Sequence, residues 1–376
     1  MKVALISFHD ALNYGASLQI YAMQQSLKEL GVDCEYIDYV NQYRGNAYCM
    51  SHHIKTEFKR KKLLSAFKYC VGIPFMSARR TMFEKFYKKN TSITAKKYTS
   101  SKEAEILNDK YDKFIVGSDQ VWNYKNNGND FAFFLDFVKD KNKKIAYSSS
   151  FGLATIPEDL KEGYIENLMQ IKYLSTREGY GVKLIKDLTG RDAELVLDPV
   201  FLLDKKQWLS LCNNKRKSGK HIFCYTNRPS QLDNFLTQTG ISQKGYKLHK
   251  LTRHLTVHDF INPTVKVSYS LSPTEFIETI ATAELVVTAS FHCVAMSIIL
   301  NKPFVAILTG DKGKDERILN VLEIVGLKDR ILDKNTALSD VNKPIDFQRV
   351  EKRIDEYKQK SLDFLKNAIF DGEAGE

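Results

Sequence analysis

The sequence predicts an α/β protein made of two Rossmann-like domains whose parallel sheets face a cleft, an arrangement called GT-B-like. Short apolar and β-branched runs alternate with segments of helical apolar spacing along the whole chain. The length of 376 residues suits two to three domains. A polar, lysine-rich stretch at 205–220 separates two such alternations. We therefore expect domains over 1–204 and 205–345, followed by a C-terminal helix and tail over 346–376.

The bulk composition narrows the class of protein. Hydrophobic residues make up 43% of the chain, which is enough to build real cores. No apolar run approaches the ~20 residues that a membrane-spanning helix needs. The first ten residues, MKVALISFHD, resemble a buried strand more than a signal peptide. The six cysteines include no CxxC pair, which disfavours a zinc site or a disulfide framework and suits a reducing cytoplasm.

One segment carries the charge imbalance of the chain. The formal net charge is +11, and Lys55–Lys97 contains thirteen Lys and Arg against two acids. Aromatic residues are interleaved with these cations, a pattern that fits an anionic membrane surface or nucleic acid. A pair of surface helices with solvated lysines fits equally well. Because the rest of the chain is near neutral, nucleic acid is the least favoured partner, and we expect a basic insertion at about 50–100.

The N-terminal part begins with a strand, a loop, a helix and a second strand. The loop holds Asn13 and Gly15, and the sequence contains neither GxGxxG nor GxxxxGK at this point, so NAD and ATP are not indicated. A third strand leads into a loop with Ser118 and Asp119, which is either a ligand loop or a tight polar turn. Arg177 lies at the carboxyl end of a later strand. The expected strands are 3–8, 34–39, 114–116, 144–148, 173–178, whose last residues are charged, and 195–197. The expected helices are 16–30, 157–169 and one that follows residue 178 and ends at about 188.

The C-terminal part repeats the alternation. Ser272 to Glu275 forms a capping box with proline at the first helical position. A helix over 346–369 shows an apolar stripe. The other expected elements are strands at 222–225, 247–251, 265–267, 285–288 and 304–308, and helices at 232–237 and 291–300.

His292 is the titratable group in the apolar unit at 284–308. It is expected on the first turn of a buried helix, at the carboxyl end of a strand, where open α/β sheets bind ligands. Ser290 stands at the N-cap position, and backbone N–H groups at Ser290–Phe291 favour an anion. A histidine beside an anion site can act as an acid catalyst, although a histidine that caps or packs is an equal reading of its position.

Six stretches in this order resemble the polysaccharide pyruvyl transferase family. They span most of the chain: FHDALNYGASLQIYAM, FIVGSDQVWN, KIAYSSSFG, YLSTREGYG, LVLDPVFLL and VVTASFHCVAMSIILNKPF. The resemblance implies a GT-B-type fold and transfer of the enolpyruvyl unit of phosphoenolpyruvate onto a sugar as a pyruvate ketal, with release of phosphate. Phosphoenolpyruvate is then a substrate, and neither a cofactor nor a metal is expected.

The resemblance also implies which residues act. The family motifs associate His292 and Arg177 with the donor, and we expect the first as general acid and the second as a bidentate anion clamp. Where the family carries an acid and a glycine around its SFHG-like motif, this chain has Ala289 and Cys293. The expected donor-binding residues are Asn13, Gly15, Ser118, Asp119, Arg177, Ser290, Phe291 and His292.

The implied acceptor is a hexose such as galactose in a lipid-linked glycan precursor. Such an acceptor would explain a basic segment at an anionic membrane, and we expect a cytoplasmic protein peripheral to the inner face of that membrane. Two alternatives stay open. A nucleotide-sugar glycosyltransferase would have the same two-domain architecture, and a homologue without turnover could bind glycan or membrane only.

Overall fold

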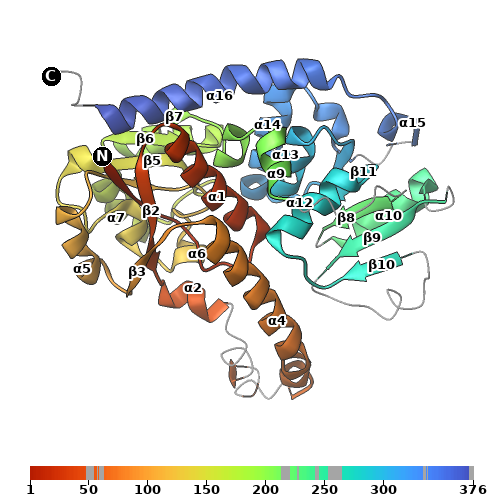
Figure 1. The fold of residues 1–376 in the computed structure, drawn as a ribbon, viewed down its shortest axis with the longest axis horizontal. Helices are drawn as coiled ribbons and strands as arrows, with labels where there is room; N and C mark the ends of the chain where they lie inside the picture. The colour runs from red at the N-terminus through yellow and green to blue at the C-terminus, as the bar shows by residue number, and fades with distance from the viewer. Residues whose placement is uncertain are drawn as a thin grey trace. The chain divides into compact units, whose positions relative to one another are not determined.

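The computed structural model describes residues 1–47, 55–56, 58, 63–212, 221–226, 228–241, 245–252, 265–332, 336 and 338–371. The chain divides into two compact units (Figure 1). Unit 1 comprises Met1–Leu202 together with Lys358–Glu376, and unit 2 comprises Leu203–Tyr357. The long helix α16 (Phe347–Phe370) therefore contributes residues to both units rather than forming a segment of its own.

Unit 1 is built on a seven-stranded parallel sheet in the order β3-β2-β1-β4-β5-β6-β7. The chain winds outward in both directions from β1, so the direction of winding switches between β1 and β4. The strands are β1 (Lys2–Ile6), β2 (Asp33–Tyr39), β3 (Ile93–Tyr98), β4 (Lys113–Val116), β5 (Lys144–Ser149), β6 (Tyr173–Thr176) and β7 (Glu194–Leu195). The helices are α1 (Tyr14–Glu29), α2 (Gln42–Ala47), α4 (Leu63–Asn90), α5 (Ser101–Ala104), α6 (Tyr124–Asn127), α7 (Glu158–Met169) and α8 (Gly179–Thr189).

Unit 2 repeats this architecture with a five-stranded parallel sheet in the order β10-β9-β8-β11-β12, and its switch lies between β8 and β11. The strands are β8 (His221–Tyr225), β9 (Lys247–Leu251), β10 (Val265–Ser268), β11 (Leu285–Thr288) and β12 (Phe304–Ala306). The helices are α9 (Lys205–Ser210), α10 (Pro229–Thr239), α12 (Pro273–Thr282), α13 (Phe291–Ile299), α14 (Lys312–Val325) and α15 (Leu338–Val341). Two parallel α/β sheets confirm the predicted fold class; a cleft between the domains stays a prediction.

Four predicted strands end earlier than expected. The strand expected at 3–8 ends at Ile6, and the strand expected at 173–178 ends at Thr176. The strand expected at 195–197 ends at Leu195, because the Leu197 N–H donates to Ser361 Oγ on α16 instead of to a neighbouring strand. The strand expected at 304–308 ends at Ala306, after which the chain turns into a loop held by Asp315. Ser361 lies 164 residues from Leu197, a separation that local apolar patterning does not report, whereas Asp315 lies only 6 residues after Thr309.

The basic segment is only partly a helical insertion. Its last residues form β3, which pairs with β2 in the register Tyr36 to Ile93 and Tyr39 to Tyr98 and makes the edge of the sheet. Lys96 and Lys97 are exposed on this strand, and lysines on an edge strand oppose pairing with another chain. The interpretation of this segment as a pair of surface helices is therefore wrong for its last residues, because exposed lysines mask the alternation of the strand.

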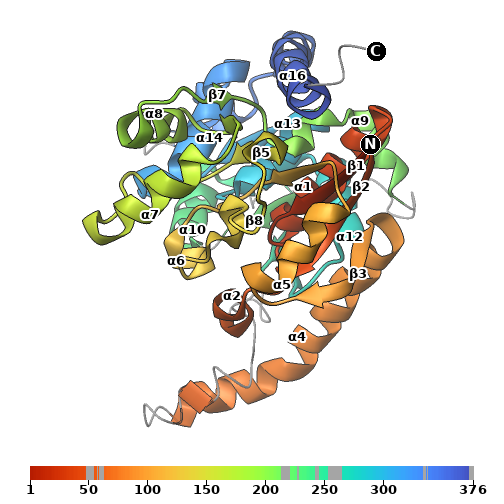
Figure 2. The same cartoon turned by 90° about the vertical axis from the view of Figure 1, so that its left-hand side faces the viewer.

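The C-terminal half of α4 is docked on unit 1, whereas its N-terminal half extends beyond the sheet (Figure 2). Arg79 is buried and donates to Tyr14 Oη at 3.2 Å and to the Leu12 carbonyl at 3.0 Å. Ile73 and Phe75, one turn earlier, are 45% and 48% exposed. Within the described ranges, no helix combines the length and apolar character that crossing a bilayer requires.

Candidate functional site

A buried polar network joins the carboxyl ends of β1, β4 and β5 in unit 1. The Ser118 N–H donates to Gln19 Oε1 at 3.0 Å, and Gln19 Nε2 donates to Ser7 Oγ at the same distance. Ser118 Oγ lies 3.1 Å from the Ser148 carbonyl. Gly117 precedes it with φ of 123°, and a Cβ there would come within 2.1 Å of the Tyr147 carbonyl, so this loop requires glycine. The loop is thus fixed by its contacts with the neighbouring strands and by the glycine that allows this close approach.

Arg177 is held at the centre of the same edge by groups from three loops. Its Nη1 donates to Asp198 Oδ2 and, at 3.1 Å, to Ser118 Oγ. Its Nη2 lies 3.3 Å from Asp119 Oδ1, and its Nε lies 4.0 Å from Glu178 Oε2. The guanidinium is 1% exposed and Asp198 is fully buried. Ser118, Asp119 and Arg177, three of the predicted site residues, are therefore in mutual contact.

In this cluster one guanidinium faces three carboxylates, so the acids outnumber the cation. Burial alone lowers the pKa of Arg177, but the carboxylates of Asp198, Asp119 and Glu178 outweigh burial and raise that pKa. Both terminal nitrogens of Arg177 donate to groups of the protein itself. The geometry therefore gives this arginine a structural task, and its role as an anion clamp stays a prediction.

Glu178, to which the sequence analysis gave no role, locks the loop after β5. Its carboxylate accepts from Ser150 Oγ at 2.7 Å, from the Phe151 N–H at 3.1 Å and from the Gly152 N–H at 3.3 Å. A Cβ on Gly152 would lie 2.1 Å from Gln120 Nε2, so the two loops are closely packed. Glu178, the acid that follows Arg177 in the family-like motif, thus holds the loop after β5 by hydrogen bonds.

Asn13 and Gly15 form the start of α1. Asn13 is the exposed N-cap, and its Oδ1 accepts from the Gly15 N–H at 2.9 Å. This cap occupies the Gly15 N–H in the described structure. Donor binding by these two residues stays a prediction.

A histidine–aspartate pair that the sequence analysis did not single out lies at the carboxyl ends of β1 and β2. His9 is buried, and its Nε2 is 3.0 Å from Asp38 Oδ1. Burial raises the pKa of Asp38, but the hydrogen bond and charge of His9, with Lys97 nearby, leave that pKa below its usual value. The available signal was a histidine directly after the first strand; the partner, 29 residues later, could not be assigned from spacing.

In unit 2, His292 lies on the first turn of α13, directly after β11 and beside the switch point of the sheet. The residue is 7% exposed, and its ring packs edge-on against Phe291 at a centroid distance of 5.0 Å. Ser290 is the N-cap of α13, as predicted, but its side chain makes no capping hydrogen bond. The predicted residues Ser290, Phe291 and His292 therefore form one short stretch at the positive end of a helix.

An arginine lies beside this stretch. The Arg317 guanidinium of α14 lies 5.8 Å from the centroid of the Phe291 ring. The loop before α14 is fixed because buried Asp315 accepts from the Thr309 N–H at 2.8 Å and from the Gly310 N–H at 2.7 Å. Arg317 could not be predicted as a site residue, since a single arginine inside a charged helical stretch carries no distinguishing pattern.

Cys293, which replaces the glycine of the family motif, is turned into the core. It is fully buried, and burial raises the pKa of its thiol to about 12. Its side chain is therefore not on an exposed surface beside His292. Among the described residues, no group of three His, Cys, Asp or Glu is arranged to hold a metal ion.

The two sheets with polar groups at their carboxyl ends define an α/β protein of GT-B type, and solved structures share this fold. A UDP-GlcNAc 2-epimerase from Methanocaldococcus jannaschii aligns with a TM-score of 0.51 at 13% identity, covering 94% of this chain and 92% of the other. Another UDP-N-acetylglucosamine 2-epimerase gives 0.54 at 10% identity, covering 97% and 95%. S. aureus MnaA with UDP gives 0.50 at 10% identity, covering 97% and 95%. At these identities the likeness shows the fold alone.

The family is shown by sequence. The model of the polysaccharide pyruvyl transferase family matches residues 13–311, and the chain belongs to this family of transferases. No curated protein sequence gives a significant match. His9 and Arg317 both lie outside the matched range, so the family model does not bear on either residue.

Proposed function

We propose that this protein transfers the enolpyruvyl group of phosphoenolpyruvate onto a sugar, forming a pyruvate ketal and releasing phosphate. Membership of the polysaccharide pyruvyl transferase family supports this reaction. The single observation that carries the residue assignment is the position of His292 on the first turn of α13, at the switch point of a parallel sheet. The proposed acceptor is a hexose such as galactose in a lipid-linked glycan precursor.

The chemistry requires an acid and a cationic surround. His292 in its protonated form donates a proton to the methylene carbon of phosphoenolpyruvate, which places positive charge on C2. One sugar hydroxyl adds to C2 and returns a proton to His292. A second hydroxyl then displaces phosphate, which leaves with that hydroxyl's proton, and the ketal ring closes. The electron pair of the broken C–O bond stays on phosphate, so no oxidant or reductant takes part.

The donor is an anion with a carboxylate and a phosphate, and unit 2 supplies groups that suit it. The N-terminus of α13 carries partial positive charge, and its N-cap side chain does not occupy the first-turn N–H groups. Arg317 adds a planar cation beside Phe291. We assign Arg317, with Ser290 and Phe291, to the donor anion, and we retain Asn13, Gly15, Ser118, Asp119 and Arg177 as proposed donor residues of unit 1.

A membrane-bound acceptor is supported by the exposed half of α4. Ile73 and Phe75 lie on α4 and expose apolar side chains, and later turns of the same helix carry exposed Arg80 and lysines. Apolar and cationic side chains together suit an anionic lipid surface. We propose peripheral binding to the inner face of the cytoplasmic membrane through this segment.

Flotation with vesicles tests the membrane proposal. Vesicles of phosphatidylcholine with phosphatidylglycerol should carry the protein upward at low salt and release it at high salt. The double variant Ile73→Ser, Phe75→Ser should lose flotation, while Ile106→Ser, a control at another exposed apolar residue, should keep it. Equal flotation of all three proteins, or none for the wild type, contradicts the proposal.

Ligand-dependent thermal stability and phosphate release together test the reaction. Phosphoenolpyruvate at a hundred times its Kd should stabilise the folded protein by about 2.7 kcal/mol. UDP-N-acetylglucosamine is the matched competitor, because the structural neighbours include UDP-GlcNAc 2-epimerases. Stabilisation by the nucleotide sugar alone would indicate a glycosyltransferase or epimerase. Stabilisation by phosphoenolpyruvate without phosphate release across acceptor sugars would indicate a binding protein that has lost turnover.

A further inference from the structure

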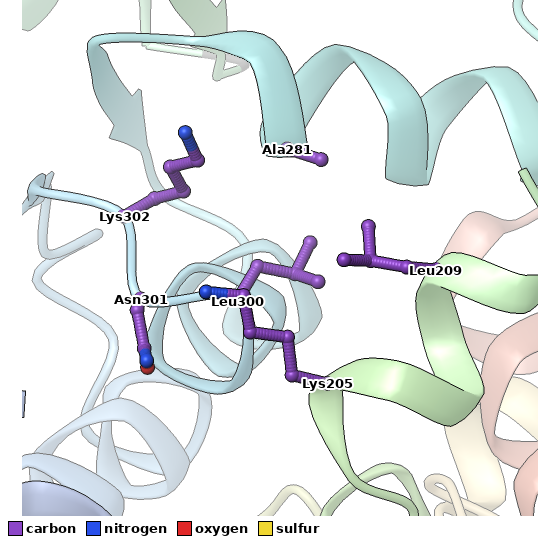
Figure 3. Close-up of a pocket in the computed structure, with 6 residues that line it drawn as sticks. All are labelled: Lys205, Leu209, Ala281, Leu300, Asn301 and Lys302. Carbon is purple, nitrogen blue, oxygen red and sulfur yellow. The ribbon is translucent and has the colours of Figure 1, made fainter. Parts of the chain in front are cut away.

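Unit 2 contains a pocket away from the candidate site. It has a volume of about 180 Å³ and is bounded by α9, the end of α12 and the turn after α13 (Figure 3). The space equals roughly six water volumes at ~30 Å³ each, which is enough for a phosphate-sized group. The lining residues are Lys205, Leu209, Ala281, Leu300, Asn301 and Lys302.

The pocket lies at the opposite edge of the sheet from His292. Helix α13 starts beside His292 and spans Phe291–Ile299, and Leu300 to Lys302 follow its last turn. Nine residues rise by roughly 13 Å at 1.5 Å per residue. The chain then enters β12 at its amino end. The pocket is therefore separate from the carboxyl edge that carries His292 and Arg317.

The lining of the pocket is cationic. Lys205 and Lys302 line the pocket from different elements; the Lys205 ammonium ends beside Leu300 and Asn301, and the Lys302 side chain extends away from them (Figure 3). Within the described part of the chain, neither ammonium has a hydrogen bond or an ion pair. Asn301 turns away and donates from Nδ2 to Glu351 Oε1 at 2.7 Å. No carboxylate is among the lining residues.

The two lysines repel each other. Burial, and then the charge of Lys205, lower the pKa of Lys302, and Glu284 only partly opposes this. A half-buried ammonium beside a like charge is stabilised by any anion that enters between them. The apolar side chains of Leu209, Ala281 and Leu300 form the rest of the wall, so the anion's charge would be met mainly by the two lysines.

We propose that this pocket binds a phosphate group, either free phosphate or the phosphate of a small metabolite. Lys205 and Lys302 are the ligands, and the apolar wall limits the bound group to a small size. Both candidate ligands share the same tetrahedral dianion chemistry. The site does not depend on the proposed reaction, because none of its residues belongs to the donor site.

Competitive acetylation of lysines, read by mass spectrometry, tests this site without turnover. Inorganic phosphate is added at constant ionic strength, and the labelling rates of Lys302 and Lys205 are followed against Lys266, an exposed lysine on β10. At ten times its Kd, phosphate should slow labelling of Lys302 about tenfold, because only free protein reacts. Lys266 should be unaffected.

Two further arms make the outcome decisive. In Lys205→Gln, whose altered side chain is exposed, the protection of Lys302 should disappear while Lys266 labels as before. Galactose 1-phosphate is run in parallel, so protection by it alone assigns the site to the phosphate of a metabolite. Lack of protection by either probe, or equal slowing at Lys266, overturns the proposal. Failure here leaves the pyruvyl transfer proposal untouched, since phosphoenolpyruvate is absent from the assay.

Discussion

The basic side chains at the carboxyl edges of the two sheets have different surroundings. In unit 1, Arg177 is enclosed by the carboxylates of Asp198, Asp119 and Glu178. In unit 2, His292 and Arg317 flank an aromatic ring beside a helix N-terminus. A buried cation among carboxylates costs free energy to separate from its partners, whereas the start of α13 has no capping side chain and can accept an anion with little rearrangement. We infer that unit 1 provides a rigid edge and unit 2 provides most of the donor's electrostatic binding.

The helices of unit 2 show the same contrast at a smaller scale. Helix α12 has a complete capping box, in which Ser272 Oγ accepts from the Glu275 N–H at 3.1 Å and Glu275 accepts in return at 2.8 Å. Helix α13 has Ser290 at the same position without a side-chain cap. In α12 the capping side chain uses a first-turn N–H group. In α13 no side chain does so, and the first turn can bind an anion.

The largest expected effect is on the stability of unit 1. Arg177→Met leaves buried carboxylates without their cation, and we expect a loss of about 3–5 kcal/mol in the free energy of unfolding. Urea unfolding of a Trp208→Phe background, in which Trp122 reports on unit 1, measures this. Arg80→Met, an exposed arginine of α4, is the control. If Arg177→Met weakens phosphoenolpyruvate binding and leaves stability intact, Arg177 is a donor clamp and the comparison fails.

The next effect is on turnover. His292→Ala removes the proposed proton donor, and we expect phosphate release to fall by roughly a hundredfold or more. Thermal stability should change little compared with that loss of rate. His221→Gln is the matched control, since His221 opens β8 at the amino edge of the same sheet. Near-normal turnover in His292→Ala contradicts the acid assignment.

A smaller effect is expected for donor binding. Arg317→Met should raise the apparent Kd for phosphoenolpyruvate by about ten- to a hundredfold, the range for one hydrogen bond to a charged group. Calorimetric titration measures this, and Arg349→Met, exposed at the start of α16, is the control. An unchanged Kd in Arg317→Met would remove this arginine from the donor site.

The smallest effects come from the two N-caps. Ser272→Ala should destabilise unit 2 by about 1 kcal/mol, because a cap is lost. Ser290→Ala should change stability by less than about 0.5 kcal/mol, because no side-chain cap exists there. Trp208 fluorescence in a Trp122→Phe background reports both. Equal losses in the two variants would show that Ser290 caps α13 in solution.

Much of the fold was predictable because buried strands and amphipathic helices leave local patterns. Strands 247–251 and 285–288 and the capping box at Ser272 appear as predicted. β3 was missed because Lys96 and Lys97 on an exposed edge mask its alternation. The contacts within the candidate sites were harder to predict from the sequence. His9 meets Asp38, and Arg177 meets Asp198, across separations that only the strand order determines.

The C-terminal part of α16 affects how the chain can fold during synthesis. Ser361 Oγ accepts from the Leu197 N–H at 2.9 Å, the Phe364 ring lies 6.3 Å from that of Tyr147, and Leu365 is fully buried. These residues belong to unit 1 but are translated after all of unit 2. Domains usually fold in the order in which they leave the ribosome. Here the first domain to emerge must wait for a late piece of its own core, so unit 2 is the first that can finish folding.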